Sequence, residues 1–247
     1  MPACRLKSIK VAPALLNKYL VKPLPRQRIN TIKPGENSDF RRTAVLPYNL
    51  QTLTAARSLH YSSRIILEAA CGKGDFLTDI AAANPDCFYI GVDYAYPVIL
   101  RAVKRAAALM LDNILFYWGD IKIFLKYDFE KTVFTQIFIN FPDPWPKRKH
   151  HKRRIIQKDT AGLFCKALQQ NSWLVIATDI KELYMYHNNV LKEFPQLVFM
   201  NSHDPFTIPY SGYKTAISTY EQKGEAAGRH IYYAVYKKIL EKERFSF

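Results

Sequence analysis

The fold of this chain is decided by the segment Arg64-Ile-Ile-Leu-Glu-Ala-Ala-Cys-Gly-Lys-Gly74. Its first seven residues are mainly apolar, which predicts a short buried strand, and a tight turn over residues 71–74 follows. Residues 75–83 have the pattern of a helix, with Pro85 just beyond its end. Glycines in such a turn let the backbone lie close to a ligand before the helix begins. The segment therefore predicts an α/β unit with a ligand at its turn.

The alternation of strand and helix continues along the rest of the chain. Further strands are expected over 87–92, 114–118, 134–139, 172–177, 197–201 and 231–237, and helices over 50–60, 96–111, 155–170, 180–194 and 217–227. This alternation predicts an α/β fold with a doubly wound, mostly parallel sheet. Ligands of such sheets bind beyond the carboxyl ends of the strands.

Acidic residues lie at or near the ends of five predicted strands: Glu68, Asp93, Asp120, Asp143 and Asp179. The glycine pair Gly72 and Gly74 lacks the third glycine of a dinucleotide-binding loop, because Leu77 occupies that place. S-adenosylmethionine has no pyrophosphate, so the shorter glycine pair suffices for it.

Three of these carboxylates suit the parts of S-adenosylmethionine. Asp93 lies where a carboxylate accepts both ribose hydroxyls, and Asp120 ends the strand beside which adenine would lie. Glu68 could accept a hydrogen bond from the amino group of the methionine moiety, directly or through water. The alternative is that Asp93 and Asp120 cap the helices that follow them.

A second informative segment is Asn140-Phe-Pro-Asp-Pro-Trp-Pro-Lys-Arg-Lys-His-His-Lys-Arg-Arg154. Its three prolines fix the backbone and exclude helix, so the turn holds Asp143 in one place. Six cations then follow within eight residues, which favours a polyanionic partner such as RNA. Phosphate contacts are expected from Lys147, Arg148, Lys149, Lys152, Arg153 and Arg154. The alternatives are a solvated charged face for these cations and, for Trp145, either a stacking surface or a buried anchor.

Charge is distributed unevenly along the 247 residues, whose formal net charge is +15. Residues 1–42 contain ten lysines and arginines against two acidic residues, a net charge of +8. Such an excess indicates a nucleic acid or another anionic surface as partner, with an inert basic surface as the alternative. Residues 1–48 are also rich in proline, and we expect an extended, irregular arm there, followed by one folded domain over 49–247.

Several classes of protein are made improbable by composition. The four cysteines show no CxxC spacing, which predicts neither a disulfide framework nor a zinc site, and we expect no metal. No apolar run has membrane-spanning length, and the first twenty residues do not have the pattern of a signal peptide. We therefore expect a reduced, cytoplasmic protein without a membrane partner, whose oligomeric state the sequence leaves open.

The chain resembles the bacterial tRNA (guanine-N7)-methyltransferases over about residues 40–237. The matching segments are Glu68 with Gly72-Lys-Gly74, Tyr89-Ile-Gly-Val-Asp93, Asn113 with Gly119-Asp120, the whole of Asn140 to Arg154, Ala177-Thr-Asp179, and Ser218-Thr-Tyr-Glu221 followed by Gly224. The Phe-Pro-Asp-Pro-Trp-Pro-Lys run is the most specific of them. Two departures are Ala70, where the family commonly has glycine, and Ser218, where it has threonine.

The resemblance implies a Rossmann-like, class I S-adenosylmethionine-dependent methyltransferase fold. It implies S-adenosylmethionine as donor and the variable-loop guanine of tRNA as acceptor. It places Asp143 at the reacting centre and Asn140 with it on the cofactor side. It places Lys147, Asp179, Ser218 and Glu221 on the acceptor side.

The chemistry of guanine N7 limits what such a site must do. N7 carries a lone pair and no proton, so methyl transfer needs no general base. Alignment of nucleophile and methyl group, worth up to about 7–11 kcal/mol, and a carboxylate near the charged ring supply the catalysis. Asp143 suits that electrostatic role and could also accept from guanine N1 and N2, a role for which Asp179 and Glu221 are rivals.

Two other functions stay open from the sequence. Asn140-Phe-Pro-Asp143 is similar to the Asn-Pro-Pro-aromatic motif of methyltransferases that act on exocyclic amines of RNA or DNA, although Phe141 interrupts the motif. The second alternative is a non-catalytic RNA-binding module on a methyltransferase scaffold. Ala70 is the feature in favour of that alternative.

Overall fold

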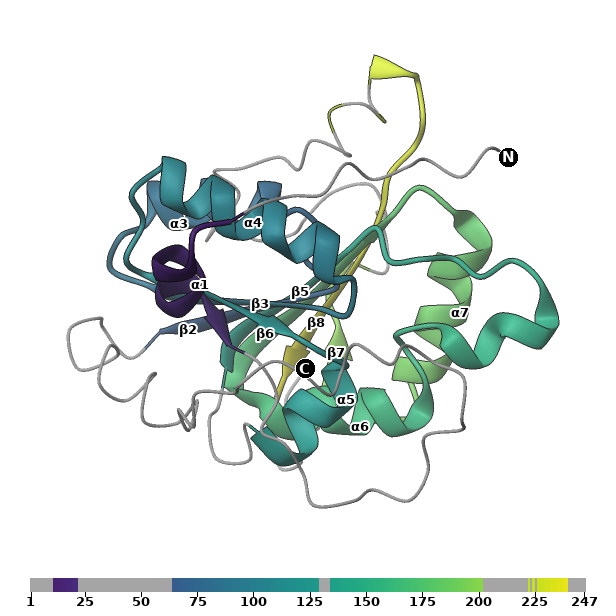
Figure 1. Cartoon of the computed structure of the whole chain (residues 1–247). Coiled ribbons are helices and arrows are strands. Elements are labelled where there is room, and N and C mark those ends of the chain that lie inside the picture. The colour runs from purple at the N-terminus through teal and green to yellow at the C-terminus, as the bar shows by residue number, and fades with distance from the viewer. Residues whose placement is uncertain are drawn as a thin grey trace, which may run out of the picture.

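A single eight-stranded sheet forms the centre of the part of the chain that the computed structural model describes, which is residues 11–21, 64–128, 134–201, 222, 224 and 226–239. The strand order is β1-β4-β3-β2-β5-β6-β8-β7 (Figure 1). The strands are β1 (Leu20–Val21), β2 (Ile65–Ala69), β3 (Phe88–Asp93), β4 (Ile114–Trp118), β5 (Phe134–Asn140), β6 (Leu168–Thr178), β7 (Leu197–Phe199) and β8 (Tyr232–Lys238). Strand β8 runs antiparallel to both neighbours, and the other pairs are parallel.

Helices cover both faces of this sheet (Figure 1). They are α1 (Pro13–Tyr19), α3 (Asp75–Ala83), α4 (Tyr96–Ala108), α5 (Ile121–Ile123), α6 (Lys158–Ala167) and α7 (Lys181–Leu191), with a π-helical turn η2 (Phe124–Asp128) and a 3-10 helix η3 (Arg148–Arg153). One hydrophobic cluster joins α1, α3 and α4 to the sheet, and a second joins η2, α6 and α7 to the opposite face. The predicted doubly wound, mostly parallel fold is therefore confirmed.

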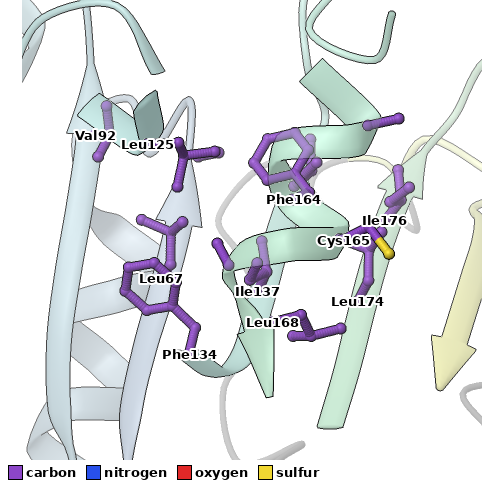
Figure 2. Close-up of a cluster of buried hydrophobic side chains, with 14 of the residues drawn as sticks. Leu67, Val92, Leu125, Phe134, Ile137, Phe164, Cys165, Leu168, Leu174 and Ile176 are labelled. Atoms are coloured by element: carbon purple, nitrogen blue, oxygen red, sulfur yellow. The ribbon is translucent and has the colours of Figure 1, made fainter. Parts of the chain in front are cut away.

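The central strands consist mainly of apolar residues because both of their faces are buried. All six residues of β3 are buried, as expected for parallel strands between two helical layers. Figure 2 shows part of the second cluster, to which Phe164 of α6, Leu67 of β2 and Ile137 of β5 belong. The chain proceeds from β2 to β3 on one side, and later strands are added on the other side through β5. The strand order thus reverses at β2 and β5, where doubly wound sheets bind ligands.

The expectation of an irregular arm over residues 1–48 is wrong for residues 11–21. These form α1 and β1, and β1 pairs with β4 at the edge of the sheet. Pro13 begins the helix, where a missing N–H costs nothing. Tyr19 is 1% exposed, and its hydroxyl donates to the Leu111 carbonyl at 2.7 Å. The prolines suggested an arm, but the apolar side chains of this segment pack on the hydrophobic cluster and the backbone of β1 pairs with the edge of β4.

Smaller differences concern the boundaries of elements. The helix expected over 155–170 spans Lys158–Ala167, and β6 begins directly after it. Residues 148–153, predicted only as a basic loop, form η3. The rest of the expected arm, the helix over 50–60 and most of the helix over 217–227 lie outside the described residues. Within the described ranges, no helix is long and apolar enough to cross a membrane.

Candidate active site

Two neighbouring strands bring Glu68 and Asn140 together at the carboxyl edge of the sheet. The Asn140 side-chain amide donates to Glu68 Oε1 at 2.9 Å. Glu68 is only 3% exposed, and its Oε2 atom has no hydrogen-bond partner. Burial raises the pKa of Glu68 to about 8, while the hydrogen bond from Asn140 lowers it. A buried carboxyl oxygen without a donor is costly, so this atom is suited to bind a polar ligand group.

Asp93 fastens the glycine turn to the end of β3. Its Oδ2 accepts from the Gly72 amide at 2.9 Å, and its Oδ1 accepts from the Ala95 amide at 2.8 Å. Burial raises the pKa of Asp93, and backbone hydrogen bonds from Ala95, Gly72 and Tyr94 oppose that rise. Each oxygen retains a lone pair for a further donor. The carboxylate can therefore hold the turn and accept from a ligand at the same time.

The backbone of the turn is left-handed at three positions. Gly72 has φ +55°, and a Cβ built there would meet nothing within 4 Å, so this side of the turn is open. Gly74 has φ +71°, and a Cβ there would lie 2.8 Å from the Ala102 Cβ. Ala70 is also left-handed, with φ 59°. Position 70 therefore favours glycine for its backbone, and alanine there is strained.

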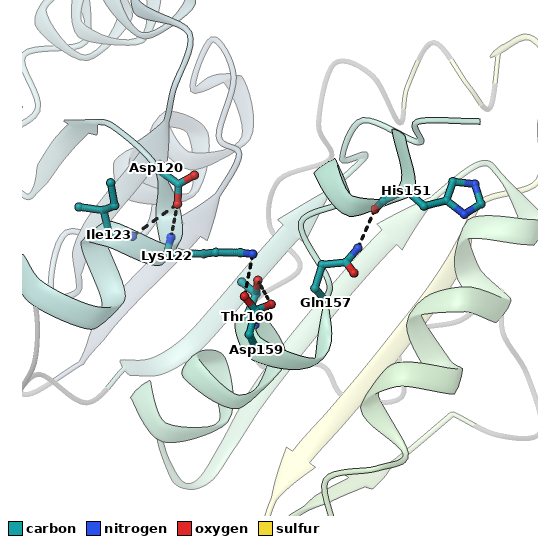
Figure 3. A network of polar contacts seen from close by, with 7 residues as sticks. All are labelled: Asp120, Lys122, Ile123, His151, Gln157, Asp159 and Thr160. Carbon is teal, nitrogen blue, oxygen red and sulfur yellow. Dashed lines mark hydrogen bonds and ion pairs between the residues drawn. The ribbon is translucent and has the colours of Figure 1, made fainter. Parts of the chain in front are cut away.

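Asp120 is an exposed helix cap in this structure. Its Oδ1 accepts from the Lys122 amide at 2.7 Å and from the Ile123 amide at 3.4 Å, at the start of α5 (Figure 3). Asp120 was expected either beside the adenine or as a helix cap, and these contacts are those of a helix cap. Beside it at the end of β4, the rings of Trp118 and Tyr96 lie 4.3 Å apart between centroids. Sequence reasoning missed this aromatic pair, because Trp118 only ends an apolar strand and the spacing does not indicate a contact with Tyr96.

The proline-rich loop after β5 presents Asp143 to solvent at the same edge. Phe141 and Trp145 have left-handed backbones, with φ 48° and 43°, which is uncommon for bulky residues. Across the edge, the hydroxyl of Tyr94 donates to Asp143 Oδ2 at 3.4 Å. Tyr94 directly follows β3, so Asp143 lies near the Asp93 side of the site. The sequence reasoning missed Tyr94, because its partner is 49 residues away.

The cationic segment after the loop divides into an exposed set and one buried residue. The exposed set is Lys147, Arg148, Lys149, Lys152 and Arg153. Trp145 is packed by its neighbours, with the His150 ring 5.8 Å from its centroid and the Arg153 guanidinium 4.9 Å from it.

Arg154, for which a phosphate contact is expected, differs from these five cations because it is only 8% exposed, so the expectation of a surface position is wrong for it. Its Nε donates to the Pro144 carbonyl at 3.0 Å, and its guanidinium lies 4.5 Å from the Tyr186 ring centroid.

Of the residues expected on the acceptor side, the structure describes Lys147 and Asp179. The Asp179 side chain, 12% exposed, forms an ion pair with Arg229, which the sequence reasoning missed. Arg229 precedes β8, and β8 is paired with β6 so that Tyr232 lies opposite Thr178. This pairing brings Arg229 to the edge where Asp179 lies. Ser218 and Glu221 lie outside the described residues.

Metal ligands do not converge in the described ranges, where no group of three or more His, Cys, Asp or Glu side chains could hold an ion. The polar groups that do converge are Glu68, Asn140, Asp93 and Asp143. The first three lie on adjacent strands and Asp143 lies in the loop after β5, around the point where the strand order reverses. Their arrangement suits a ligand with both amino and hydroxyl groups.

Comparison with known proteins identifies the family. Residues 62–234 match a family model described as "Putative methyltransferase". The tRNA (guanine-N(7)-)-methyltransferase of Clostridioides difficile is 35% identical over 175 residues, which are 70% of this chain and 80% of the relative. The enzyme of the same name from Mycoplasma genitalium is 34% identical over 181 residues, 72% of this chain and 85% of the relative. The chain belongs to the bacterial tRNA (guanine-N7-)-methyltransferase family.

Solved structures show the same fold in more distant methyltransferases. The antibiotic-resistance methyltransferase Kmr is 15% identical, with a TM-score of 0.55 over 80% of this chain and 96% of that one. The 16S rRNA methyltransferase KamB is 10% identical, with a TM-score of 0.56 over 76% of this chain and 94% of that one. These likenesses confirm the Rossmann-like methyltransferase fold expected for this member of the tRNA (guanine-N7-)-methyltransferase family.

Proposed function

We propose that this chain transfers a methyl group from S-adenosylmethionine to N7 of the variable-loop guanine of tRNA. The observation that carries the proposal is the meeting of Asp143 and Tyr94 across the carboxyl edge of the sheet. It sets the carboxylate of the family's most specific motif beside the groups that suit the cofactor. The names of the relatives support guanine N7 of tRNA as the acceptor.

The described residues fit S-adenosylmethionine. The unpartnered Oε2 of Glu68 suits the amino group of the methionine moiety, and the remaining lone pairs of Asp93 suit the ribose hydroxyls. Gly72 leaves open space beside the turn, and Trp118 with Tyr96 offers aromatic surface for the adenine. When bound, S-adenosylmethionine supplies an electrophilic methyl group on a positively charged sulfur.

Asp143 would act on the acceptor by its charge and its position. Guanine N7 has no proton to lose, and the purine ring becomes positively charged as N7 is methylated. A carboxylate held beside the ring stabilises that charge, and a fixed dipole or charge of this kind contributes about 3–4 kcal/mol in measured cases. Asp143 is exposed in the free protein. Bound guanine must therefore exclude water from it before the full electrostatic effect develops.

Recognition of guanine requires acceptors for its N1–H and its amino group. Asp179 is suited to this role, since a carboxylate accepts from both donors, whereas adenine presents a different pattern. Asp143 and Glu221 are the alternative acceptors, and Lys147 lies on the same acceptor side by resemblance. The exposed cations Arg148, Lys149, Lys152 and Arg153 would bind the tRNA backbone. A cytoplasmic location fits a tRNA substrate and stays a prediction.

The test is methylation of tRNA by the purified full-length chain. Unmodified tRNA and isotopically labelled S-adenosylmethionine are incubated with the protein, and the tRNA is digested to nucleosides for mass spectrometry. We expect labelled N7-methylguanosine from the variable loop. Labelled N6-methyladenosine would instead identify an amino-group methyltransferase. Binding of tRNA without cofactor binding, measured by calorimetry, would identify a non-catalytic module.

A further inference from the structure

The loop that carries Asp143 has few backbone hydrogen bonds, of which the one from the Phe141 amide to the Ala177 carbonyl, at 2.8 Å, fixes its start. Pro142, Pro144 and Pro146 have no N–H group to donate. The left-handed backbones of Phe141 and Trp145 add strain, which persists only where the surroundings impose it. Beyond that bond, the shape of the loop around Asp143 depends on contacts from side chains outside it.

Arg154 supplies the shortest contact from a side chain to the backbone of this loop among the described residues, and His151 Nε2 lies 3.4 Å from the Pro146 carbonyl oxygen. The Arg154 Nε atom donates to the carbonyl of Pro144, the residue directly after Asp143, at 3.0 Å. Its Nη2 atom lies 3.0 Å from His151 Nε2, and the Tyr186 ring lies 4.5 Å away. The planar guanidinium is therefore bonded along its edge and covered by an aromatic ring, which a lysine could not reproduce.

The surroundings of Arg154 do not serve to neutralise its charge. Among the described residues, no acidic side chain forms an ion pair with it, although it is only 8% exposed. A buried cation is costly to keep without compensating contacts. The contacts present are a carbonyl, an imidazole and an aromatic ring, and one of them is part of the Asp143 loop.

The residues that contact Arg154, His151 and Tyr186, are themselves held by the helices α6 and α7. Gln157, at the start of α6, donates from its side chain to the His151 carbonyl at 2.7 Å (Figure 3). Tyr186 belongs to α7, whose apolar face packs on the sheet. A continuous set of contacts thus runs from α7 through Arg154 to the loop and to Asp143.

We infer that Arg154 is a positioning residue, which fixes the loop that presents Asp143 to the guanine, and that it does not bind tRNA phosphates. This inference rests on the proposed function, because it concerns the same reaction. It separates Arg154 from the exposed Lys152, two residues earlier in the same cationic segment. Arg154 affects turnover through the position of the loop, and Lys152 contributes to the affinity for RNA.

The experiment compares Arg154→Lys, Arg154→Gln and Lys152→Gln in the full-length protein. The two Arg154 variants are expected to lose turnover by about 10²-fold, the size of effect that misplacement of a reacting group causes, with the KM for tRNA nearly unchanged. Lys152→Gln is expected to raise the KM for tRNA. It should also make the dependence of binding on salt shallower by about one phosphate contact. Full turnover in Arg154→Lys, or a salt dependence in Arg154→Gln like that of Lys152→Gln, would overturn the inference.

A second variant guards against loss of folding. Tyr186→Leu removes the ring beneath Arg154 and leaves the arginine in place, and it should show the same loss of turnover with the KM for tRNA retained. Thermal unfolding and calorimetric binding of S-adenosylmethionine establish which variants are folded. Wild-type turnover in a folded Tyr186→Leu protein, together with misfolding of both Arg154 variants, would count against positioning through this contact.

A fluorescence measurement that does not depend on methyl transfer separates this inference from the proposed function. Trp145 lies in the loop, so its fluorescence in a Trp118→Phe, Trp173→Phe background reports the state of the loop. Arg154→Lys should increase quenching of Trp145 by acrylamide, and Lys152→Gln should not. Unchanged quenching in Arg154→Lys would overturn the positioning role even if the wild type methylates tRNA. Increased quenching in a protein that methylates no guanine would overturn the proposed function alone.

Discussion

Asn140 and Glu68 form a hydrogen bond between adjacent parallel strands that satisfies one oxygen of a buried carboxyl group and leaves the other without a partner. Burial raises the pKa of Glu68 to about 8, so the free protein holds this group mainly as the neutral acid at pH 7. A cationic amino group at Oε2 favours the ionised form. Binding of S-adenosylmethionine should therefore release a proton from Glu68.

The first prediction is that affinity for S-adenosylmethionine rises with pH between 6 and 7.5. In this range the ligand's amino group stays largely protonated, and each pH unit should change affinity by up to ten-fold. Calorimetry in buffers of different ionisation enthalpy should detect the released proton. Glu68→Gln, which keeps an acceptor for Asn140, should bind more weakly and without this pH dependence. If the affinity of Glu68→Gln depended on pH as strongly as that of the wild type, the released proton would come from another group.

The second prediction concerns Asp143, whose charge is expected to act in the chemical step. Asp143→Asn keeps the shape of the side chain and should lower kcat by about 10²–10³-fold, with cofactor affinity nearly unchanged. Tyr94→Phe is the matched control, since it removes only the 3.4 Å hydrogen bond to Asp143 and should have a much smaller effect. Single-turnover assays give the chemical rate directly. Near-wild-type turnover in Asp143→Asn would refute the electrostatic role.

The third prediction is that Ala70→Gly stabilises the protein. Alanine at φ 59° costs about 1–2 kcal/mol, and glycine removes that strain but gains entropy in the unfolded chain. The net gain should be about 0.5–1 kcal/mol in the free energy of unfolding, measured with urea. Ala69→Gly, one residue earlier in the buried strand β2, should instead destabilise. Destabilisation by both changes would mean that the Ala70 methyl group contributes packing that outweighs the strain.

The fourth prediction concerns His187, which is 1% exposed with neither ring nitrogen hydrogen-bonded. Burial, and next the charge of Arg154, lower its pKa from 6.5 to about 3. The unfolded chain therefore takes up a proton below pH 6.5 that the folded protein does not, and stability falls as pH decreases from 6.5 towards 3. The slope from this group is at most about 1.4 kcal/mol per pH unit.

Removal of the imidazole should remove that sensitivity. His187→Leu is expected to raise the urea midpoint at pH 5 more than at pH 7.5, because the variant no longer has the group that protonates on unfolding. An equal shift of the urea midpoint at both pH values would show that packing alone explains the effect of His187→Leu.

The central strands and the acids at their ends could be predicted because the relevant signals are local. An apolar run followed by a carboxylate and a glycine turn, as at Glu68 and Gly72, specifies the structure of its own neighbourhood. The motif around Asp143 could be assigned to a family on the same ground. Each of these predictions depends on residues within one strand, turn and helix.

The parts that escaped prediction depend on contacts between distant segments. Arg153 and Arg154 are both arginines, and their neighbouring positions in the sequence do not show which one is buried. The geometry of η3 and the contact with Tyr186 of α7 bury Arg154. The pairing of Asp179 with Arg229 joins residues 50 apart, through the antiparallel pairing of β8. Likewise, α1 and β1 gain their structure from the edge of β4, which the sequence of residues 11–21 does not reveal.

The short strand β1 also has a consequence for the behaviour of the protein at high concentration. A terminal strand of a sheet offers unpaired N–H and C=O groups to other molecules, and such edges are common starting points for aggregation. In this chain, Leu20 and Val21 occupy part of the outer side of β4, at Phe116 and Tyr117. Strand β1 is then itself the terminal strand of the sheet, and because it is two residues long it offers few unpaired groups to another molecule.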